Sequence, residues 1–136
     1  MSLFNTMAIS GSAMHAQTVR LNTIASNMAN VDSISSNQNE TYRSKQPVFE
    51  TVLQGQIGLP SGGVRVREIV DNPQPLVMEY QPNHPMANEE GYIFRPNVNV
   101  IEEMANMMAA SRNYETNVEV LNTVKQLMLR TIQLGK

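Results

Sequence analysis

Several groups that often define a function are missing from this chain of 136 residues. Cysteine is absent, which excludes disulfides, thiolate metal sites and cysteine nucleophiles. The sequence has no run of about 18 apolar residues, so we expect no direct insertion into a membrane. The N-terminal stretch also lacks the basic start and short apolar block of a cleavable signal peptide. If the chain is exported, we expect it to use another route.

Charge is also scarce, and neither sign is concentrated. The chain has ten Lys and Arg against twelve Asp and Glu, which gives a net charge of −2. The basic residues are scattered rather than clustered, whereas a nucleic-acid surface needs a basic patch. Nucleic acid is therefore not an expected partner.

Residue types that perform catalysis do not converge in this sequence. His15 and His84 lie far apart, and neither has a second His or a Cys at metal-ligand spacing. The acids at 89–90 and at 102–103 are neighbours in sequence, and neighbouring side chains do not converge on one catalytic site. We expect these acids to be solvated or to face a helix dipole. The sequence therefore predicts no enzymatic activity, no metal and no cofactor.

Residues 1–30 are expected to form one long amphipathic helix. Arg20 is its only charged residue, and its other polar positions are mostly Asn, Ser, Thr and Gln. Hydroxyl and amide side chains weaken an isolated helix, so this one needs packing partners. Its larger apolar side chains recur every seven residues, the spacing of a coiled-coil stripe, at Met7, Met14, Leu21 and Met28.

Residues 98–136 are expected to form a second long helix. Pro96 ends the preceding strand, and Asn99 followed three places later by Glu102 is a capping pair that starts the helix. Apolar or aromatic side chains again recur every seven residues, at Val100, Met107, Tyr114, Leu121 and Met128.

Two such helices cannot bury both stripes against each other. A helix of about 28 residues is about 42 Å long, and one of about 35 residues is about 52 Å long. A hairpin of two rods leaves most of each surface open, so we expect other subunits to cover it. The residues expected to pack between subunits are Met7, Met14, Leu21, Ile24 and Met28 in the first helix and Met104, Met107, Tyr114, Val118, Leu121 and Met128 in the second.

The middle of the chain is expected to be a polar loop at 31–46 and a small antiparallel β-rich insert at 47–97. Strands are indicated at 63–70, 76–80 and 92–94, each bounded by Gly or Pro, and residues 47–54 suit a strand or a short helix. The predicted fold class is α+β, with long N- and C-terminal helices paired as a coiled-coil-like domain around this insert.

The sequence resembles the bacterial flagellar axial proteins. LNTIASNMANVDS, at 21–33, resembles their N-terminal signature, and NVEVLNTVK, at 117–125, resembles the C-terminal one. The segment 31–33 departs from the Thr-x-Gly-Tyr pattern of many hook and distal-rod relatives, so the conformation of 31–41 is not carried over from them. Similarity to the proximal-rod members of the family extends over 42–49, 62–64, 82–87, 91–93 and 96–98.

This resemblance implies a structural subunit of the proximal rod of the flagellar basal body. Such a subunit would polymerise through its terminal helices into a torque-transmitting hollow drive shaft that surrounds the export channel. It would be exported without a cleavable signal peptide and assembled in the periplasm. The implied partners are other copies of the chain, other proximal and distal rod subunits, an export-gate adaptor and the flagellar type III export apparatus.

Two other functions are compatible with long amphipathic helices. A soluble helical binding module, such as a secretion chaperone, would form a discrete oligomer with compact, protected ends. A peripheral membrane protein would lie on lipid through its first helix, but that helix has no Lys or Arg flanking the apolar stripe except Arg20. The sequence therefore favours the polymer subunit, with the binding module as the alternative.

Overall fold

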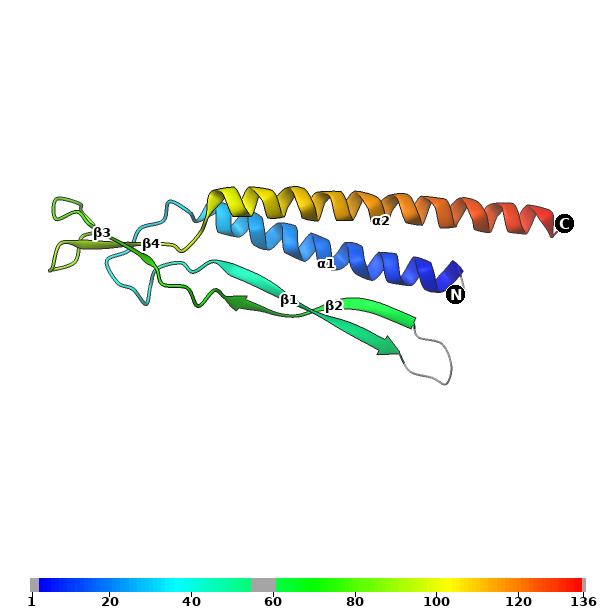
Figure 1. Ribbon diagram of the computed structural model, residues 1–136, viewed down its shortest axis with the longest axis horizontal. Coiled ribbons are helices and arrows are strands. Elements are labelled where there is room, and N and C mark those ends of the chain that lie inside the picture. The colour runs from blue at the N-terminus through cyan, green and yellow to red at the C-terminus, as the bar shows by residue number, and fades with distance from the viewer. Residues whose placement is uncertain (1–2, 55–60, 136) are drawn as a thin grey trace.

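The computed structural model describes residues 3–54 and 61–135 and has the predicted α+β architecture. Two long terminal helices pair with each other, and the segment between them in the sequence forms a small antiparallel β insert (Figure 1). The elements are α1 (Leu3–Ala29), β1 (Lys45–Gln54), β2 (Ser61–Asp71), β3 (Val77–Tyr80), β4 (Tyr92–Arg95) and α2 (Val100–Leu134).

Helix α1 is the middle layer of the molecule. It runs antiparallel to α2, which lies on one side, and the β1–β2 pair lies on the other side (Figure 1). Its hydroxyl side chains bond back to carbonyls of the preceding turn: Thr18 and Thr23 donate to Met14 O and Val19 O, at 2.9 Å each. These bonds satisfy side chains that would otherwise compete with the helix. The paired α1 and α2 are called the helical stem below.

Helix α2 begins with the predicted cap. The side-chain oxygen of Asn99 accepts hydrogen bonds from Ile101 N (3.1 Å) and Glu102 N (3.4 Å). These bonds satisfy two backbone N–H groups that have no partner within the helix. Asn99 is therefore confirmed as the cap of α2, and the helix begins at Val100, two residues after the start of the predicted range.

The β insert is divided into two separate two-stranded antiparallel sheets. Strand β1 pairs with β2 from Lys45↔Asp71 onward, which settles residues 47–54 as strand. Strand β3 pairs with β4 beyond the end of the stem at which α1 ends, and Ser35 of the preceding loop bridges to Phe94 (Figure 1). Pro73 and Pro75 separate β2 from β3, and because proline has no N–H to donate, the first ladder stops before the second begins.

The apolar core within the chain is small. In the described ranges the buried apolar side chains are Ala16, Ile24, Leu76, Ile93, Ala110 and Val124. The accessible surface is 9696 Å² for a mass of 15.2 kDa, whereas a compact monomer of this mass exposes about 7,100 Å². The chain therefore exposes roughly 2,600 Å² more than a compact monomer does.

Candidate subunit interface

The predicted stripe on α1 lies beside the surface that this helix buries within the chain. Met7 is 39% exposed, and Met14, Leu21 and Met28 are half-buried. Ile24 is 4% exposed and belongs to the chain's own core. The larger apolar side chains of α1 thus keep an open surface even though the helix is covered on two sides.

The surface that α1 buries is made of small and polar side chains. Ser10, Ala16, Thr23 and Asn27 are all at most 6% exposed, and Ile24 is the one large apolar member. Short side chains let α2 and the β1–β2 pair approach closely on opposite sides of the helix. Internal packing therefore uses the small residues and leaves the Met and Leu stripe partly free.

Helix α2 shows the same division. Its buried residues are Glu103, Ala110 and Val124, and they face α1, because among the helices and strands of the described ranges α2 packs against α1 alone. These positions also lie at multiples of seven residues, but they are offset by three from the predicted stripe. The seven-residue period was correct, and the stripe of large side chains flanks the contact with α1.

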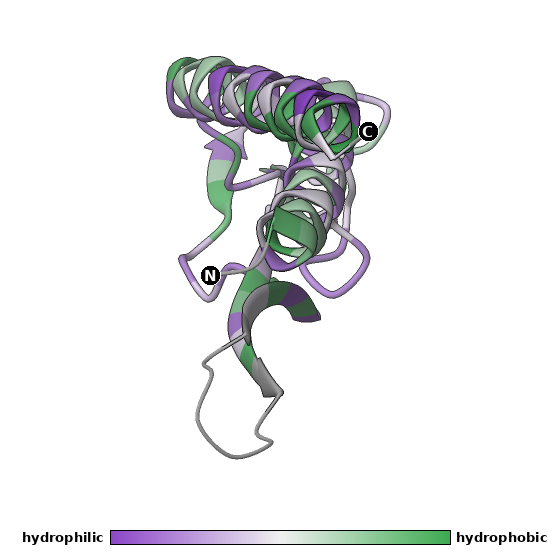
Figure 2. Ribbon diagram, turned by 90° about the vertical axis from the view of Figure 1, so that its right-hand side faces the viewer, coloured by the Kyte–Doolittle hydropathy of each residue, from purple (hydrophilic) through white to green (hydrophobic). Residues whose placement is uncertain are grey.

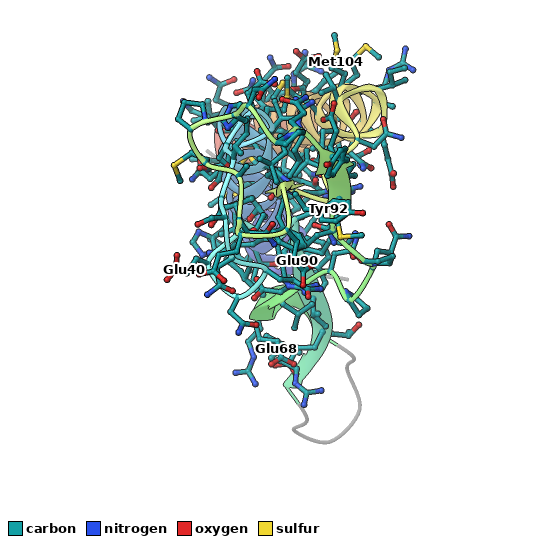
Figure 3. All side chains as sticks on the ribbon, turned by 90° about the vertical axis from the view of Figure 1, so that its left-hand side faces the viewer. Glu40, Glu68, Glu90, Tyr92 and Met104 are labelled. Atoms are coloured by element: carbon teal, nitrogen blue, oxygen red, sulfur yellow. The ribbon has the colours of Figure 1, made fainter. Side chains whose placement is uncertain are left out.

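The predicted residues of α2 are distributed along this flank. Met107, Leu121 and Met128 are half-buried. Met104, Tyr114 and Val118 are 52%, 37% and 36% exposed. Figure 3 shows Met104 at the outer edge of the molecule, on the opposite side from Glu68 of the β1–β2 pair. In Figure 2, which looks along the stem from the end with both termini, hydrophobic segments occur around both helices and not only where they meet.

The C-terminal end of α2 extends past the start of α1 (Figure 1). Counted along the antiparallel helices from the Asn27–Glu103 contact, Leu3 lies level with about residue 127 of α2. This overhang, residues 127–134, carries apolar side chains on several sides. Leu127, Leu129, Ile132 and Leu134 are 45%, 52%, 64% and 88% exposed. Arg130, Thr131 and Gln133 are also exposed in this segment, but large apolar side chains grouped on an exposed surface commonly mark an interaction site.

A buried polar junction joins three elements where α1 ends and α2 begins. Asn27, on α1, is 1% exposed, and Glu103, on α2, is 8% exposed. The Asn27 side-chain nitrogen donates to Glu103 Oε1 (2.8 Å) and to the carbonyl of Lys45 at the start of β1 (2.9 Å). We call this set of contacts the Asn27 junction.

The loop segments that flank the sheets complete the Asn27 junction. The Asn97 side chain accepts from Ser44 N (2.8 Å) and donates to the carbonyl of Gln74 (2.9 Å). The Ser44 carbonyl in turn accepts from Asn72 N (2.7 Å). Residues from four separate stretches of the chain thus meet at one point.

Sequence reasoning did not find the Asn27 junction. Glu103 was expected to be solvated or to face a helix dipole; it lies in the first turn of α2, as the second alternative requires, but it is buried against Asn27 and not solvated. The available signal was weak: an Asn in an almost uncharged helix, and an acid one turn into another helix. Their 76-residue separation has no local pattern that would pair them.

An open cavity of about 700 Å³ lies next to the Asn27 junction, between α1, α2 and β1. Its lining is mainly polar, and Arg20 donates to the Asn106 side chain (3.0 Å) at one wall. Among the described residues, no group of three His, Cys, Asp or Glu side chains is placed to hold a metal ion. In the same part of the chain, neither helix is long and apolar enough to cross a membrane.

Known proteins match the chain from end to end. Residues 7–33 match the family described as "Flagella basal body rod protein", and residues 89–134 match "Flagellar basal body rod FlgEFG protein C-terminal". The two matches cover the two stem helices, so the fold is that of a structural protein of the flagellar rod class.

Individual relatives narrow this class. The chain is 51% identical to the flagellar basal-body rod protein FlgC of Yersinia enterocolitica, 46% to that of Escherichia coli O157:H7 and 31% to that of Bacillus subtilis (strain 168). Each match covers the whole of both chains. The chain belongs to the FlgC family of flagellar basal-body rod proteins, and it is a structural subunit of the proximal rod.

Proposed function

We propose that this subunit polymerises through the open flanks of both stem helices, with copies of itself and with other rod proteins. The polymer is the hollow shaft that transmits torque and surrounds the export channel. One observation supports this proposal above the others: the stem buries mainly small and polar side chains internally and leaves its Met, Leu and Tyr stripes half-buried or exposed.

The area available for assembly is large enough for permanent contacts. Obligate interfaces bury about 2,000–5,000 Å² summed over both partners, which is about 1,000–2,500 Å² per partner, and the excess of roughly 2,600 Å² on this chain is enough for such a contact. Methionine is common in the exposed stripes, and its flexible side chain adapts to neighbours in slightly different positions. Such a surface suits a subunit that contacts both its own copies and related rod proteins.

We also propose partners, a location and an export route for the subunit. Its partners are proximal and distal rod subunits and an export-gate adaptor, and the flagellar type III apparatus exports it to the periplasm without a cleavable signal. The subunit has no catalytic role, and it carries load through many shared helix contacts. The β sheets face outward or form lateral contacts.

Leu21→Asp and Leu121→Asp test the proposed assembly surface. Both leucines are half-buried on the open flanks, so each change places a carboxylate in the contact between subunits. Burying an unpaired charge costs several kcal/mol, and we expect assembled rods and swimming to fall more than about tenfold. Rods are counted in isolated basal bodies, and limited proteolysis checks that the β insert is still folded.

Asn22→Asp and Asn122→Asp are the matched controls, since both positions are exposed and adjacent to the test residues. They should leave rods at the wild-type level. Intact rods and full motility in Leu21→Asp and Leu121→Asp would contradict the proposal. A discrete soluble oligomer of the wild-type chain that never enters rods would instead support the binding-module alternative.

A further inference from the structure

The Asn27 carboxamide is bonded to the main chain of β1 in two directions. Its oxygen accepts from Lys45 N (2.9 Å), and its nitrogen donates to Lys45 O (2.9 Å). The same oxygen accepts from the Tyr42 hydroxyl (2.9 Å), and the second N–H reaches Glu103 (2.8 Å). Both donors and both lone pairs of the amide are therefore used. Neither Asp, which cannot donate, nor Ser, which is too short, reproduces this pattern.

The buried carboxylate of Glu103 depends on the hydrogen bond that the Asn27 amide donates to it. Within residues 3–54 and 61–135, no Lys, Arg or His forms an ion pair with its carboxylate. Its short hydrogen bond comes from Asn27, and the Ser44 hydroxyl is at 3.5 Å. A buried carboxylate without a cation needs such donors, because an unpaired buried charge is strongly unfavourable.

A second contact holds the other end of the β1–β2 pair to the same helix. The Ser12 hydroxyl accepts from Val64 N (3.2 Å) on β2, and Gly63 lies close enough that an added Cβ would be 3.4 Å from the Ser12 oxygen. Ser12 and Asn27 are about 22 Å apart along α1. The matching stretch of the sheet, from Lys45 to Thr51 opposite Val64, is about 20 Å long. One helix thus holds the sheet by hydrogen bonds at two well-separated points.

We propose that Asn27 and Glu103 are positioning residues, which together fix the direction in which the β1–β2 pair runs along the helical stem from its Lys45 end. This inference rests on the proposed function, because a fixed direction matters when the stem is locked into a rod. The segment between α1 and β1 has no helix or ladder of its own apart from the Ser35 bridge. Without the Asn27 junction, the sheet would keep its packing against α1 and the Ser12 contact, but its Lys45 end would lose the hydrogen bonds that fix it to the stem.

Asn27→Asp tests the role of the amide at nearly constant size. The variant loses both N–H donors and places two carboxylates at the site of the 2.8 Å contact. We expect assembled rods and swimming-ring area to fall on the order of tenfold or more at equal protein level. Asn22→Asp makes the same chemical change at an exposed position of the same helix and should stay within about twofold of wild type.

Reversing the polarity of the contact separates positioning from general damage. Glu103→Gln retains an oxygen that accepts from Asn27, so we expect rods within about twofold of wild type. In the double variant Asn27→Asp with Glu103→Gln, the new amide donates to the new carboxylate, and at least about a threefold recovery over Asn27→Asp is expected. Wild-type rod levels in Asn27→Asp, or a double variant no better than Asn27→Asp, would overturn the inference. Leu21→Asp and Leu121→Asp distinguish the two proposals. If both variants lose rods while Asn27→Asp keeps them, the positioning role fails and the proposed function stands. If both variants keep rods, the proposed function fails.

Discussion

At the scale of single residues, this fold depends on a few polar and small side chains at points of close approach. Asn99 starts α2, Ser12 meets a strand, and Asn27 joins three elements. Gly91 has a comparable role at the β3–β4 turn, where its φ is +83°. An added Cβ there would lie 2.9 Å from a ring carbon of Tyr80 and 3.1 Å from Pro82 Cβ.

Gly91→Ala should therefore lower the free energy of unfolding by about 1–3 kcal/mol, since both the backbone angle and the space are unfavourable for a side chain. Urea unfolding followed by tyrosine fluorescence measures this, because Tyr80 and Tyr92 pack edge to face with ring centroids 5.1 Å apart. Gly11→Ala is the control. No atom lies within 4 Å of the added Cβ, and alanine should stabilise the helix by about 0.5–1 kcal/mol. Equal effects of the two changes would contradict this assignment.

At the scale of elements, the main feature is the register of the two stem helices. Ala110 on α2 is 0% exposed, so α1 approaches this position of α2 closely. The predicted stripe at Leu121 and Met128 lies beside this contact. A close approach of this kind fixes the separation of the helices and presents both open flanks to neighbours.

Ala110→Leu should destabilise the stem by about 1–3 kcal/mol, because extra methylene groups have no room in a close contact. Ala109→Leu is the matched control: this neighbour is exposed, and its substitution should change stability by no more than about 0.5 kcal/mol. Urea midpoints from far-ultraviolet circular dichroism of the full chain measure both. Similar midpoints for the two variants would show that Ala110 does not set the helix separation.

At the scale of the whole molecule, the chain is extended and layered, and part of it has no internal support. The overhang at residues 127–134 lies past the first residue of α1 and exposes four large apolar side chains. A monomer gains little from keeping such a segment helical, whereas a rod can surround it with other subunits.

Truncation after Gln126 should therefore separate folding from assembly. We expect the shortened chain to keep its stem, with a loss of no more than about 1–2 kcal/mol of stability from the half-buried Met128. Rods should nevertheless be absent from isolated basal bodies. Urea unfolding and rod counts measure the two effects, and rods at wild-type levels would contradict a role for the overhang.

The sequence alone determined the local and periodic features of this protein. A seven-residue repeat predicted two long helices, Asn99 predicted where the second begins, and prolines and glycines marked the strands. The length of the two predicted helices, which a hairpin and a small insert cannot cover, predicted that other subunits are required. These features were predictable because each depends on neighbouring residues or on a fixed spacing.

The tertiary structure decided which side of each helix faces inward, how the strands divide into two sheets and where Asn27 and Glu103 meet. A repeat of seven gives the spacing of a contact surface but not which side of the helix faces inward, and here the stripe of large apolar side chains lies beside the chain's own contact. The Asn27 junction joins residues 76 positions apart. Its partners are selected by three-dimensional proximity and by the need of buried polar atoms for hydrogen bonds, and neither leaves a local pattern in the sequence.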